Sequence, residues 1–455
     1  MTGPKRFPNR DEIAVVRTEA EGLEPGVEGA EERRLAGRVL ARREMGKLVF
    51  LDLVDRSGRI QLLCPVDRTG AVDVHLGDIV GVAGHATKSR RGEPSLLVDS
   101  LEMLARIRAP LPDTFHGLTD VEQRYRRRHL DLLMNADTRA DFMLRARIVS
   151  TVRRALDDDG FVEVETPILQ PRYGGAFARP FATHHNELDQ TLYLRIATEL
   201  YLKRLIVGGL ERVYEIGKDF RNEGVSYKHN PEFTMLEWYE AYADYGDTMD
   251  RMERLVARVA QEAVGTTEVT FRGHRIDLSR WQRVKLVDAL REHGLWTHDE
   301  AELRALLAAR DVDTQHDRTW AQLIDHALSH FVEPALIQPT ILYDYPVELS
   351  PFARASDTEG IVERFEYYVG GMELGNAFTE INDSEEQSAR FAMQQAEGAG
   401  GNVDAEPGDP DYVEALSYGM PPTGGLGMGI DRLAMVLLGK DSIRDVILFP
   451  ALRER

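Results

Sequence analysis

The sequence has almost no cysteine and no long apolar run. Cys64 is the one cysteine among 455 residues, so the chain can form no internal disulfide and no cysteine metal cluster. No apolar stretch approaches the roughly 20 residues that span a bilayer. Residues 1–10 carry Pro, Lys and Arg, but no apolar segment of a secretory signal follows them. The sequence therefore predicts a cytoplasmic protein that has no membrane segment.

Net positive charge is also missing. The formal charge of −20 argues against a protein that coats nucleic acid without specificity. Residues 1–110 are nearly balanced, with 18 Lys and Arg against 17 Asp and Glu, so the acidic excess lies beyond them. Basic clusters at 33–34, 42–43, 90–91 and 124–128 fit either a solvated face or contact with an anionic partner.

The N-terminal quarter has the pattern of a small β-barrel. Short strand-like runs separated by turn residues occur at 35–40, 48–54, 60–64, 79–86 and 95–104. Five such strands in about 70 residues are typical of an oligonucleotide-binding (OB) barrel. We therefore predict an irregular lead-in over 1–33, an OB-fold domain over 34–109 and a linker over 110–135 with a basic helix.

The rest of the chain, 136–455, predicts a second, α+β domain. A helix is expected over 138–159, where Gly160 ends it, and a strand follows at 161–165. Later strand candidates do not alternate regularly with helices, which favours an antiparallel sheet flanked by helices over a doubly wound sheet. Residues 246–339 read as a mostly helical insertion.

One motif predicts a hairpin that carries chemistry. An Arg in a strand, a turn closed by Gly224 and a second strand would present a shared face, which comprises Arg221, Glu223, Phe233, Glu237 and Tyr239. Arg clamps phosphate and carboxylate oxygens, and Phe can stack on a purine. The alternative is a surface hairpin with an ordinary Arg–Glu pair.

Two further patterns point the same way. Glu366 and Glu373 flank a strand region beside the Gly370-Gly371 turn, and carboxylates so placed can bind Mg²⁺ together with phosphates. The alternative is an acidic strand face. The cluster Gly424–Gly429 runs straight into a helix-like segment that begins at Ile430. Its glycines allow close backbone approach and Arg432 could meet a nucleotide, although such a glycine cluster is a weak signal alone.

Together these motifs resemble a known family. Residues 160–167, 220–224 with 229–237, and 425–432 look like the three signature motifs of class II aminoacyl-tRNA synthetases, in the right order. The runs 179–185, 195–203, 229–245 and 376–383 are similar to the lysyl-tRNA synthetases in particular. The resemblance extends from about residue 34 to 450. It implies an OB-fold anticodon-binding domain followed by a class II catalytic domain.

The resemblance implies an ATP site. Arg221 and Arg432 would be the catalytic residues, with Arg221 on the α-phosphate and Arg432 sandwiching the adenine against Phe233. Mg²⁺ would be held by Glu366 and Glu373. The ATP-binding set implied is Arg221, Glu223, His229, Asn230, Phe233, Glu366 and Arg432.

It also implies a lysine pocket and an anticodon site. Carboxylates are what a cationic substrate needs once it leaves water, and the lysine-binding set implied is Gly175, Glu199, Glu237, Tyr239, Asn376, Phe378 and Glu380. In the barrel, Phe50 would stack on an anticodon base, Gln61 would read a uridine edge and Arg42 would hold the backbone.

The expected activity is that of a lysine–tRNA ligase, which activates L-lysine with ATP and transfers it to tRNA(Lys). The resemblance implies a homodimer built around Pro167. One alternative is a lysyl transferase that acts on an acceptor other than tRNA. The other is a non-catalytic RNA-binding paralogue, which the presence of Arg221, Glu366, Glu373 and Arg432 disfavours.

Overall fold

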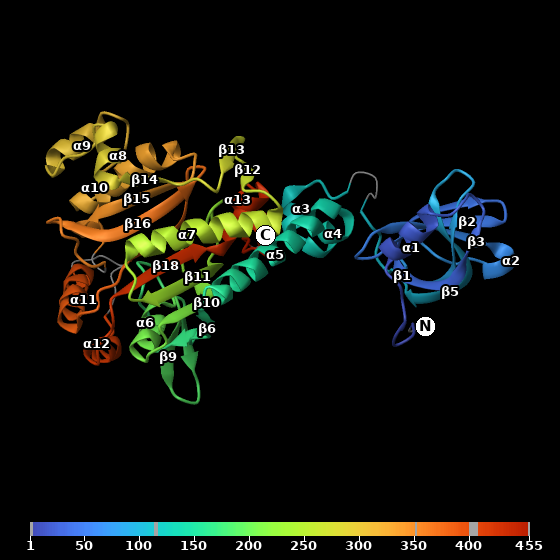
Figure 1. The fold of residues 1–455 in the computed structure, drawn as a ribbon, viewed down its shortest axis with the longest axis horizontal. Coiled ribbons are helices and arrows are strands. Elements are labelled where there is room, and N and C mark those ends of the chain that lie inside the picture. Colours follow the sequence, from blue (N-terminus) through green and yellow to red (C-terminus); the bar gives the residue numbers. More distant parts are fainter. Residues whose placement is uncertain (1–2, 113–116, 351–352, 400–407, 454–455) are drawn as a thin grey trace. The chain divides into compact units, whose positions relative to one another are not determined.

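The chain folds into two compact units, Met1–Val121 and Glu122–Arg455 (Figure 1). The computed structural model describes residues 3–112, 117–350, 353–399 and 408–453. Each unit has a hydrophobic core of its own. Within the described residues, no helix combines the length and the apolar character that crossing a membrane requires.

The first unit contains the predicted barrel, which is confirmed as a closed five-stranded structure. Side chains alternate along its second strand, where Val49, Leu51 and Leu53 are buried in the barrel and Phe50 is half-buried on the outside. The strand order around the barrel is β1-β2-β3-β5-β4. The strands are β1 (Glu28–Met45), β2 (Leu48–Val54), β3 (Arg59–Pro65), β4 (Ile79–Lys88) and β5 (Pro94–Ala105).

The residues before the barrel differ from the irregular lead-in that the sequence predicts. They form helix α1 (Ile13–Glu21), and Ile13, Val16 and Ala20 are fully buried against the barrel core. These three residues recur at helical spacing, so one stripe of a short polar helix closes the barrel. The first strand also begins earlier than predicted, at Glu28. A short helix, α2 (Val66–Thr69), follows β3.

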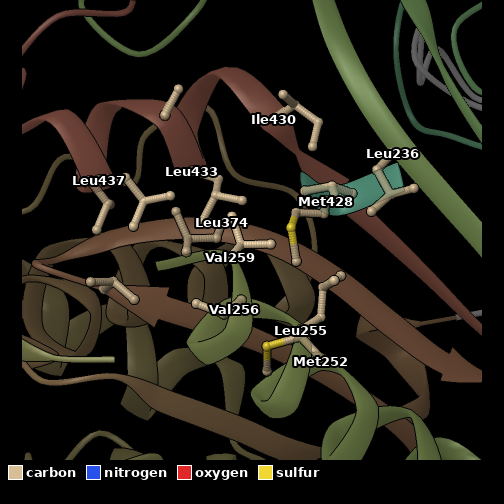
Figure 2. Close-up of a cluster of buried hydrophobic side chains, with 14 of the residues drawn as sticks. Leu236, Met252, Leu255, Val256, Val259, Leu374, Met428, Ile430, Leu433 and Leu437 are labelled. Atoms are coloured by element: carbon tan, nitrogen blue, oxygen red, sulfur yellow. The ribbon is translucent and has the colours of Figure 1, made fainter. Parts of the chain in front are cut away.

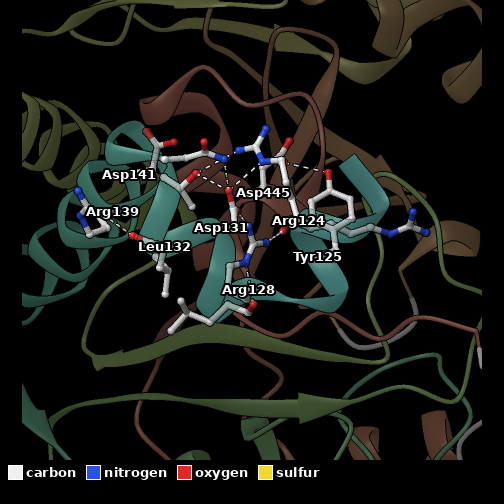
Figure 3. Close-up of polar contacts among 12 residues, drawn as sticks. Arg124, Tyr125, Arg128, Asp131, Leu132, Arg139, Asp141 and Asp445 are labelled. Carbon is white, nitrogen blue, oxygen red and sulfur yellow. Dashed lines mark hydrogen bonds and ion pairs between the residues drawn. The ribbon is translucent and has the colours of Figure 1, made fainter. Parts of the chain in front are cut away.

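Two helices, rather than one, occupy the predicted basic linker, and their polar contacts tie them into the second unit (Figure 3). Asp131 is fully buried and accepts hydrogen bonds from Arg124 Nε at 2.9 Å and from Arg128 Nη1 at 2.5 Å. Arg128 Nε also donates to the carbonyl of Leu448 at 2.9 Å. Each buried charge is thus paired, as burial demands. The helices are α3 (Val121–Arg126) and α4 (Arg128–Met134).

The second unit is built on an eight-stranded sheet in the order β14-β15-β16-β17-β18-β11-β10-β6. Only the outermost pairs, β14 with β15 and β10 with β6, are parallel; the others are antiparallel, which confirms the predicted α+β class. The strands are β6 (Val162–Glu163), β10 (Arg212–Phe220), β11 (Glu232–Ala241), β14 (Gln282–Lys285), β15 (Thr340–Pro346), β16 (Ile361–Val369), β17 (Met372–Thr379) and β18 (Thr423–Gly429).

Three helices pack on this sheet and build the main core: α5 (Ala136–Asp158), α7 (Tyr245–Val259) and α13 (Ile430–Leu438). Figure 2 shows side chains of α7 and α13 meeting those of the central strands. Leu236 and Met428 are fully buried there. The apolar stripe of α7 explains its place, because one side of this helix is apolar and the other carries charge.

The segment 246–339 is less separate than a helical insertion would be. Its first helix, α7, belongs to the main core, and β14 extends the main sheet. The hairpin β12 (Glu268–Phe271) with β13 (His274–Asp277) lies between them in sequence. The later helices of the segment share a smaller core with β15 and β16.

The remaining elements are short. A three-stranded sheet in the order β7-β9-β8 precedes helix α6, which packs on β10 and β11 and begins with Glu199. These elements are β7 (Leu169–Gln170), β8 (Ala182–His185), β9 (Gln190–Leu194), α6 (Glu199–Val207), η1 (Ala260–Val264), α8 (Leu286–Glu292), α9 (Glu300–Ala308), α10 (Trp320–Ala327), η2 (Leu328–Val332), η3 (Glu333–Ala335), η4 (Val347–Leu349), α11 (Ser384–Ala399), α12 (Pro410–Ser417) and α14 (Ile443–Val446).

Candidate active site

A cavity of about 400 Å³ lies over the central strands of the second unit. Along β11, Leu236 and Trp238 belong to the core, whereas Glu237 and Tyr239 line the cavity. Because successive side chains of a strand point to opposite faces, the cavity lies on the face that the core does not use. It gathers every residue that the sequence assigns to ATP, metal or lysine: Gly175, Glu199, Arg221, Glu223, His229, Asn230, Phe233, Glu237, Tyr239, Glu366, Glu373, Asn376, Phe378, Glu380 and Arg432.

The floor of the cavity is made by glycines of β18. The predicted glycine cluster is a strand, in which Leu426 and Met428 face the core and Gly425 and Gly427 face the cavity. A Cβ at Gly425 would come within 2.1 Å of Glu380 Oε1. Any side chain there would occupy the space next to this carboxylate, so glycine is what keeps the cavity open.

Arg221 dominates one end of the cavity, which we call the phosphate end. It stands one residue beyond β10, and its connection to β11 is the loop 221–231 rather than the tight turn predicted at Gly224. Its guanidinium lies 5.2 Å from the ring centroid of Phe233. Its Nε is buried and has no hydrogen-bond partner among the described residues. A partly buried guanidinium with an unused donor is ready to bind an anion.

The two predicted metal carboxylates lie at the phosphate end, each beside an arginine. Arg432 Nη1 donates to Glu373 Oε2 at 3.0 Å, and Arg364 Nη2 donates to Glu366 Oε1 at 2.5 Å. Arg432 lowers the pKa of Glu373 against the effect of burial, whereas burial raises the pKa of Glu366. Burial and these two carboxylates also raise the pKa of Glu333 to about 7. Each of the two carboxylates is therefore balanced by an arginine of the chain.

These carboxylates suit Mg²⁺ better than a metal that is held by protein ligands alone. Among the described residues, no three His, Cys, Asp or Glu side chains converge as a complete metal site. Mg²⁺ usually keeps several waters and takes one or two carboxylates together with substrate phosphates. The oxygen donors of Glu366 and Glu373 fit that pattern, provided that a phosphate-bearing substrate supplies the remaining ligands.

His229, Asn230 and Glu223 line the same end but differ in how firmly they are held. His229 Nδ1 lies 2.9 Å from Ser226 Oγ, and burial together with the charge of Arg432 lowers the pKa of His229 to about 4. Asn230 is buried, and its amide donates to the carbonyl of Glu232 at 2.6 Å. Glu223 is exposed at the rim. Because of its lowered pKa, the imidazole of His229 is uncharged at neutral pH.

The other end, which we call the amine end, is acidic. Glu237 is 5% exposed; Thr198 N donates to its Oε1 at 3.1 Å and Tyr239 OH to its Oε2 at 3.2 Å. Burial, followed by repulsion from Asp219 and Glu199, raises the pKa of Glu237 to about 8. Such an environment favours a proton or a bound cation.

Glu380 is the deepest acid at the amine end. It is fully buried, and neither carboxylate oxygen has a hydrogen-bond partner in the described structure apart from an ion-pair contact with Lys203. Burial raises the pKa of Glu380 well above its ordinary value, although Lys203 opposes the shift. A buried carboxylate of this kind requires a cationic partner.

The other residues that are predicted to bind lysine complete the walls of the cavity. Asn376 Oδ1 accepts a hydrogen bond from Arg364 Nε at 2.8 Å, so its orientation is fixed. The ring centroid of Phe378 lies 5.4 Å from Lys203 Nζ. Gly175 has a φ of +85°, and a Cβ there would approach Glu199 Cβ to 2.9 Å. Glycine therefore allows the loop to pass this close to α6.

The sequence analysis predicted no role for two cations at the site, Arg364 and Lys203. Arg364 lies on β16 on the same side as Glu366, so the two-residue spacing within a strand was the available signal. Lys203 follows Glu199 by four residues, which on a helix brings the two side chains together. Both residues pair with carboxylates that the sequence had singled out.

In the barrel unit, the predicted anticodon residues are only partly together. Phe50 and Gln61 lie on the neighbouring strands β2 and β3. Gln61 pairs with Asp52, and Asp52 lies on the same face of β2 as Phe50, so the two predicted residues share a face. The register places Arg43 opposite Phe50, with its guanidinium 6.0 Å from the ring centroid. Arg42 faces the other side and pairs with Glu44. Arg43 is therefore the nearer cation, although the sequence favoured Arg42.

Comparisons with protein families agree with this division into two units. The family described as tRNA synthetases class II (D, K and N) matches residues 120–453. The family described as OB-fold nucleic acid binding domain matches residues 34–104. The first match covers the cavity and the sheet below it, and the second covers the barrel.

Individual relatives extend over nearly the whole chain. A lysine–tRNA ligase of Bacillus subtilis (strain 168) is 49% identical over 440 residues, which are 94% of this chain and 88% of that protein. A lysine–tRNA ligase of Roseiflexus sp. (strain RS-1) is 51% identical over 443 residues, covering 94% and 91%. One of Carboxydothermus hydrogenoformans is 49% identical over 435 residues, covering 93% and 89%.

Proposed function

The chain belongs to the class II tRNA synthetases, within their lysine–tRNA ligases, and from that premise we propose how its residues divide the reaction. As a member of this family it uses ATP to join lysine to tRNA(Lys). We assign activation of lysine to the cavity of the second unit and recognition of the tRNA anticodon to the barrel.

One observation carries the assignment of the cavity: its unpaired charges have opposite signs at its two ends. At the phosphate end Arg221 Nε has no hydrogen-bond partner among the described residues. At the amine end Glu237 and Glu380 are buried carboxylates with raised pKa values, and Lys203 pairs with Glu380. Lysine has its carboxylate at one end and its ε-ammonium at the other. An extended lysine bound with its carboxylate towards Arg221 satisfies both ends.

The activation step requires positioning and charge neutralisation rather than a protein nucleophile. The lysine carboxylate attacks the α-phosphate of ATP in line and diphosphate leaves, so that lysyl-adenylate forms. Arg221 contacts both the carboxylate and the α-phosphate and stabilises the charge that develops between them. Phe233 and Arg432 hold the adenine, and His229 lies near the terminal phosphates.

Mg²⁺ bound to Glu366 and Glu373 would neutralise the phosphate oxygens. To receive it, Glu373 shares its carboxylate between the metal and Arg432, and Glu366 remains oriented by Arg364. Glu223 and Asn230 complete the nucleotide site on the loop between β10 and β11.

The amine end selects the amino acid. Glu199 and the loop at Gly175 receive the α-amino group. The carboxylates of Glu237 and Glu380 receive the ε-ammonium, with the hydroxyl of Tyr239 beside them, while Asn376 and Phe378 form the wall. Burial makes these contacts strong, because a charge-assisted contact that is removed from water is costly to lose.

Transfer to tRNA needs the barrel. We assign base stacking to Phe50, reading of a uridine edge to Gln61 and backbone contact to Arg42, with Arg43 beside Phe50 as a further cation. We also propose that the protein acts as a homodimer around Pro167 and works in the cytoplasm, where tRNA is charged for translation.

Lysine-dependent ATP–diphosphate exchange, followed by aminoacylation of total tRNA, tests the function. The wild-type chain should support both with lysine. Phe50→Ala should leave exchange unchanged and weaken charging of tRNA, since one stacked base contributes roughly 1–3 kcal/mol.

The matched control is Val66→Ala, which truncates an exposed apolar residue elsewhere on the barrel. It should change neither reaction. If Phe50→Ala and the wild type charged tRNA equally well, the assignment of Phe50 to the anticodon site would be contradicted. Exchange without any charging of tRNA would favour a ligase for another acceptor.

A further inference from the structure

At the back of the amine end, one lysine of the chain itself is buried between two of the carboxylates. Lys203 lies on α6, and its side chain is 1% exposed. Its Nζ donates to Glu199 Oε1 at 2.5 Å and forms an ion pair with Glu380. The ring centroids of Tyr239 and Phe378 lie 5.8 Å and 5.4 Å from the same nitrogen.

The surroundings of Lys203 are dominated by acid. From α6 itself Glu199 faces it, from β11 Tyr239, from the end of β17 Glu380, and from α12 Tyr412. Glu237 of β11 lies one step further away, where it accepts a hydrogen bond from Tyr239 and repels Glu380. The neighbouring cation on α6, Arg204, points instead to Asp409, with Nη2 to Oδ2 at 2.6 Å. Although burial disfavours the ammonium, Glu199 and Glu380 raise the pKa of Lys203 well above its ordinary value.

The count of charges at this end is informative. Three carboxylates, Glu199, Glu237 and Glu380, face one built-in ammonium. A bound lysine brings two more ammonium groups, after which three cations face three anions. Without Lys203, the buried carboxylates of Glu237 and Glu380 and the partly buried one of Glu199 would have no ion-pair partner among the described residues of the free protein, a state that burial penalises strongly.

On the proposed function, we infer that Lys203 is a positioning residue for lysine recognition: its ammonium keeps Glu380 ionised and fixed so that this carboxylate can accept the substrate's ε-ammonium. Lys203 acts through Glu380 and Glu199 and does not itself bind the substrate.

The test is Lys203→Met, which keeps the length of the side chain and removes its charge. Lysine-dependent ATP–diphosphate exchange is measured with the full chain from pH 6 to pH 9.5. The KM for lysine should rise roughly 10- to 100-fold at pH 7, the loss expected for one charge-assisted contact. The KM for ATP should stay unchanged.

The pH profile separates this role from a merely structural one. Without the ammonium, burial and repulsion raise the pKa of Glu380 further, so a larger fraction of the carboxyl is protonated at a given pH and it ionises as the pH rises. The acidic limb of kcat/KM for lysine should therefore move to higher pH, and affinity should recover at alkaline pH. A uniform loss at every pH, in kcat and in both KM values, would overturn the inference.

Arg204→Met is the matched control, because it removes the next cation of α6 from its own ion pair with Asp409. It should leave the lysine KM and its pH profile unchanged. An unaltered profile in folded Lys203→Met would overturn the inference, whereas a wild-type chain without lysine-dependent exchange would overturn the proposed function instead.

If Lys203→Met does not fold, the double variant Lys203→Met/Glu199→Gln removes one buried carboxylate along with the ammonium. It is compared with Glu199→Gln alone. Because Glu380 still loses its cation, the acidic limb of the double variant should lie at higher pH than that of Glu199→Gln. Coincident limbs would show that Lys203 has no influence on lysine recognition.

Discussion

The two ends of the active-site cavity treat their carboxylates in opposite ways. At the phosphate end Glu366 and Glu373 each have an arginine partner, and Arg221 Nε has no hydrogen-bond partner among the described residues. At the amine end the ammonium of Lys203 pairs with Glu199 and Glu380, while burial and repulsion raise the pKa of Glu237. The leftover charge at each end is the complement of the ligand group expected there. The charges that a pocket's own residues do not balance thus indicate the charges of the ligand that it binds.

The largest expected effect concerns the amine end. Norleucine has nearly the length of lysine without the ε-ammonium, so Glu237 and Glu380 would gain no cation from it in a desolvated pocket. A site built to bind a polar group rejects an analogue that lacks it by about 10⁴ or more. Diphosphate exchange with the unaltered protein should therefore be at least that much less efficient with norleucine than with lysine.

Glu380→Gln sharpens the same test. It should raise the KM for lysine and spare the KM for ATP, and it should narrow the gap between lysine and norleucine. Exchange driven by aspartate or asparagine, with lysine inactive, would contradict the assignment of the acidic end to an ammonium group.

The next effect concerns the phosphate end. Arg221→Ala removes the cation that meets developing charge, so lysine-dependent exchange should fall by roughly 10²-fold or more. Lys218→Ala, on β10 but outside the cavity, should exchange at the wild-type rate. Near wild-type exchange by Arg221→Ala would remove the leading role given to this residue.

A smaller effect should follow at the metal carboxylates. Glu373→Gln replaces one oxygen anion by a neutral amide and leaves Arg432 without its ion pair. The Mg²⁺ concentration that gives half-maximal exchange should rise about 10-fold, as expected for the loss of one charged ligand. The matched variant Glu363→Gln lies on the same sheet, on β16, outside the cavity. Identical Mg²⁺ curves for the two variants would contradict the metal role of Glu373.

The smallest effect is on the unfolding free energy of the protein. It comes from the phosphate end of the cavity, where the charge of one histidine depends on pH. Burial and the cations of the phosphate end lower the pKa of His229 to about 4, below the ordinary value of an unfolded His. As the pH falls from about 6.5 to about 4, the unfolded chain binds a proton that the native chain does not, so native stability is lost.

His229→Gln should abolish that contribution. Between pH 7 and pH 5 its unfolding free energy should decrease by about 1 kcal/mol less than that of the wild type, after allowance for solvent screening. Urea unfolding at both pH values measures this difference. His184→Gln, at an exposed position, should behave like the wild type; an equal decrease in all three proteins would contradict a buried neutral His229.

The sequence predicted much of this arrangement because its signals are local. Alternating strands with turns gave the barrel, and the absence of regular β-α-β alternation gave the antiparallel sheet. Arg221, Glu237 and Glu380 could be named because their residue types and motif spacing match a family pattern. The helix α1 escaped detection because its apolar stripe is only three residues, Ile13, Val16 and Ala20, within a charged segment.

The amino-acid sequence by itself determined which chemical groups are available: an arginine loop, paired glutamates, a glycine strand and a barrel. Only the tertiary structure decided which of those charges find partners inside the chain. Arg432 and Glu373 are 59 positions apart, and Lys203 and Glu380 are farther apart still, yet each pair meets in the folded protein. The physical reason is that pairing and burial are properties of packed elements, so the free charges that select a ligand emerge only when the sheet brings distant segments together.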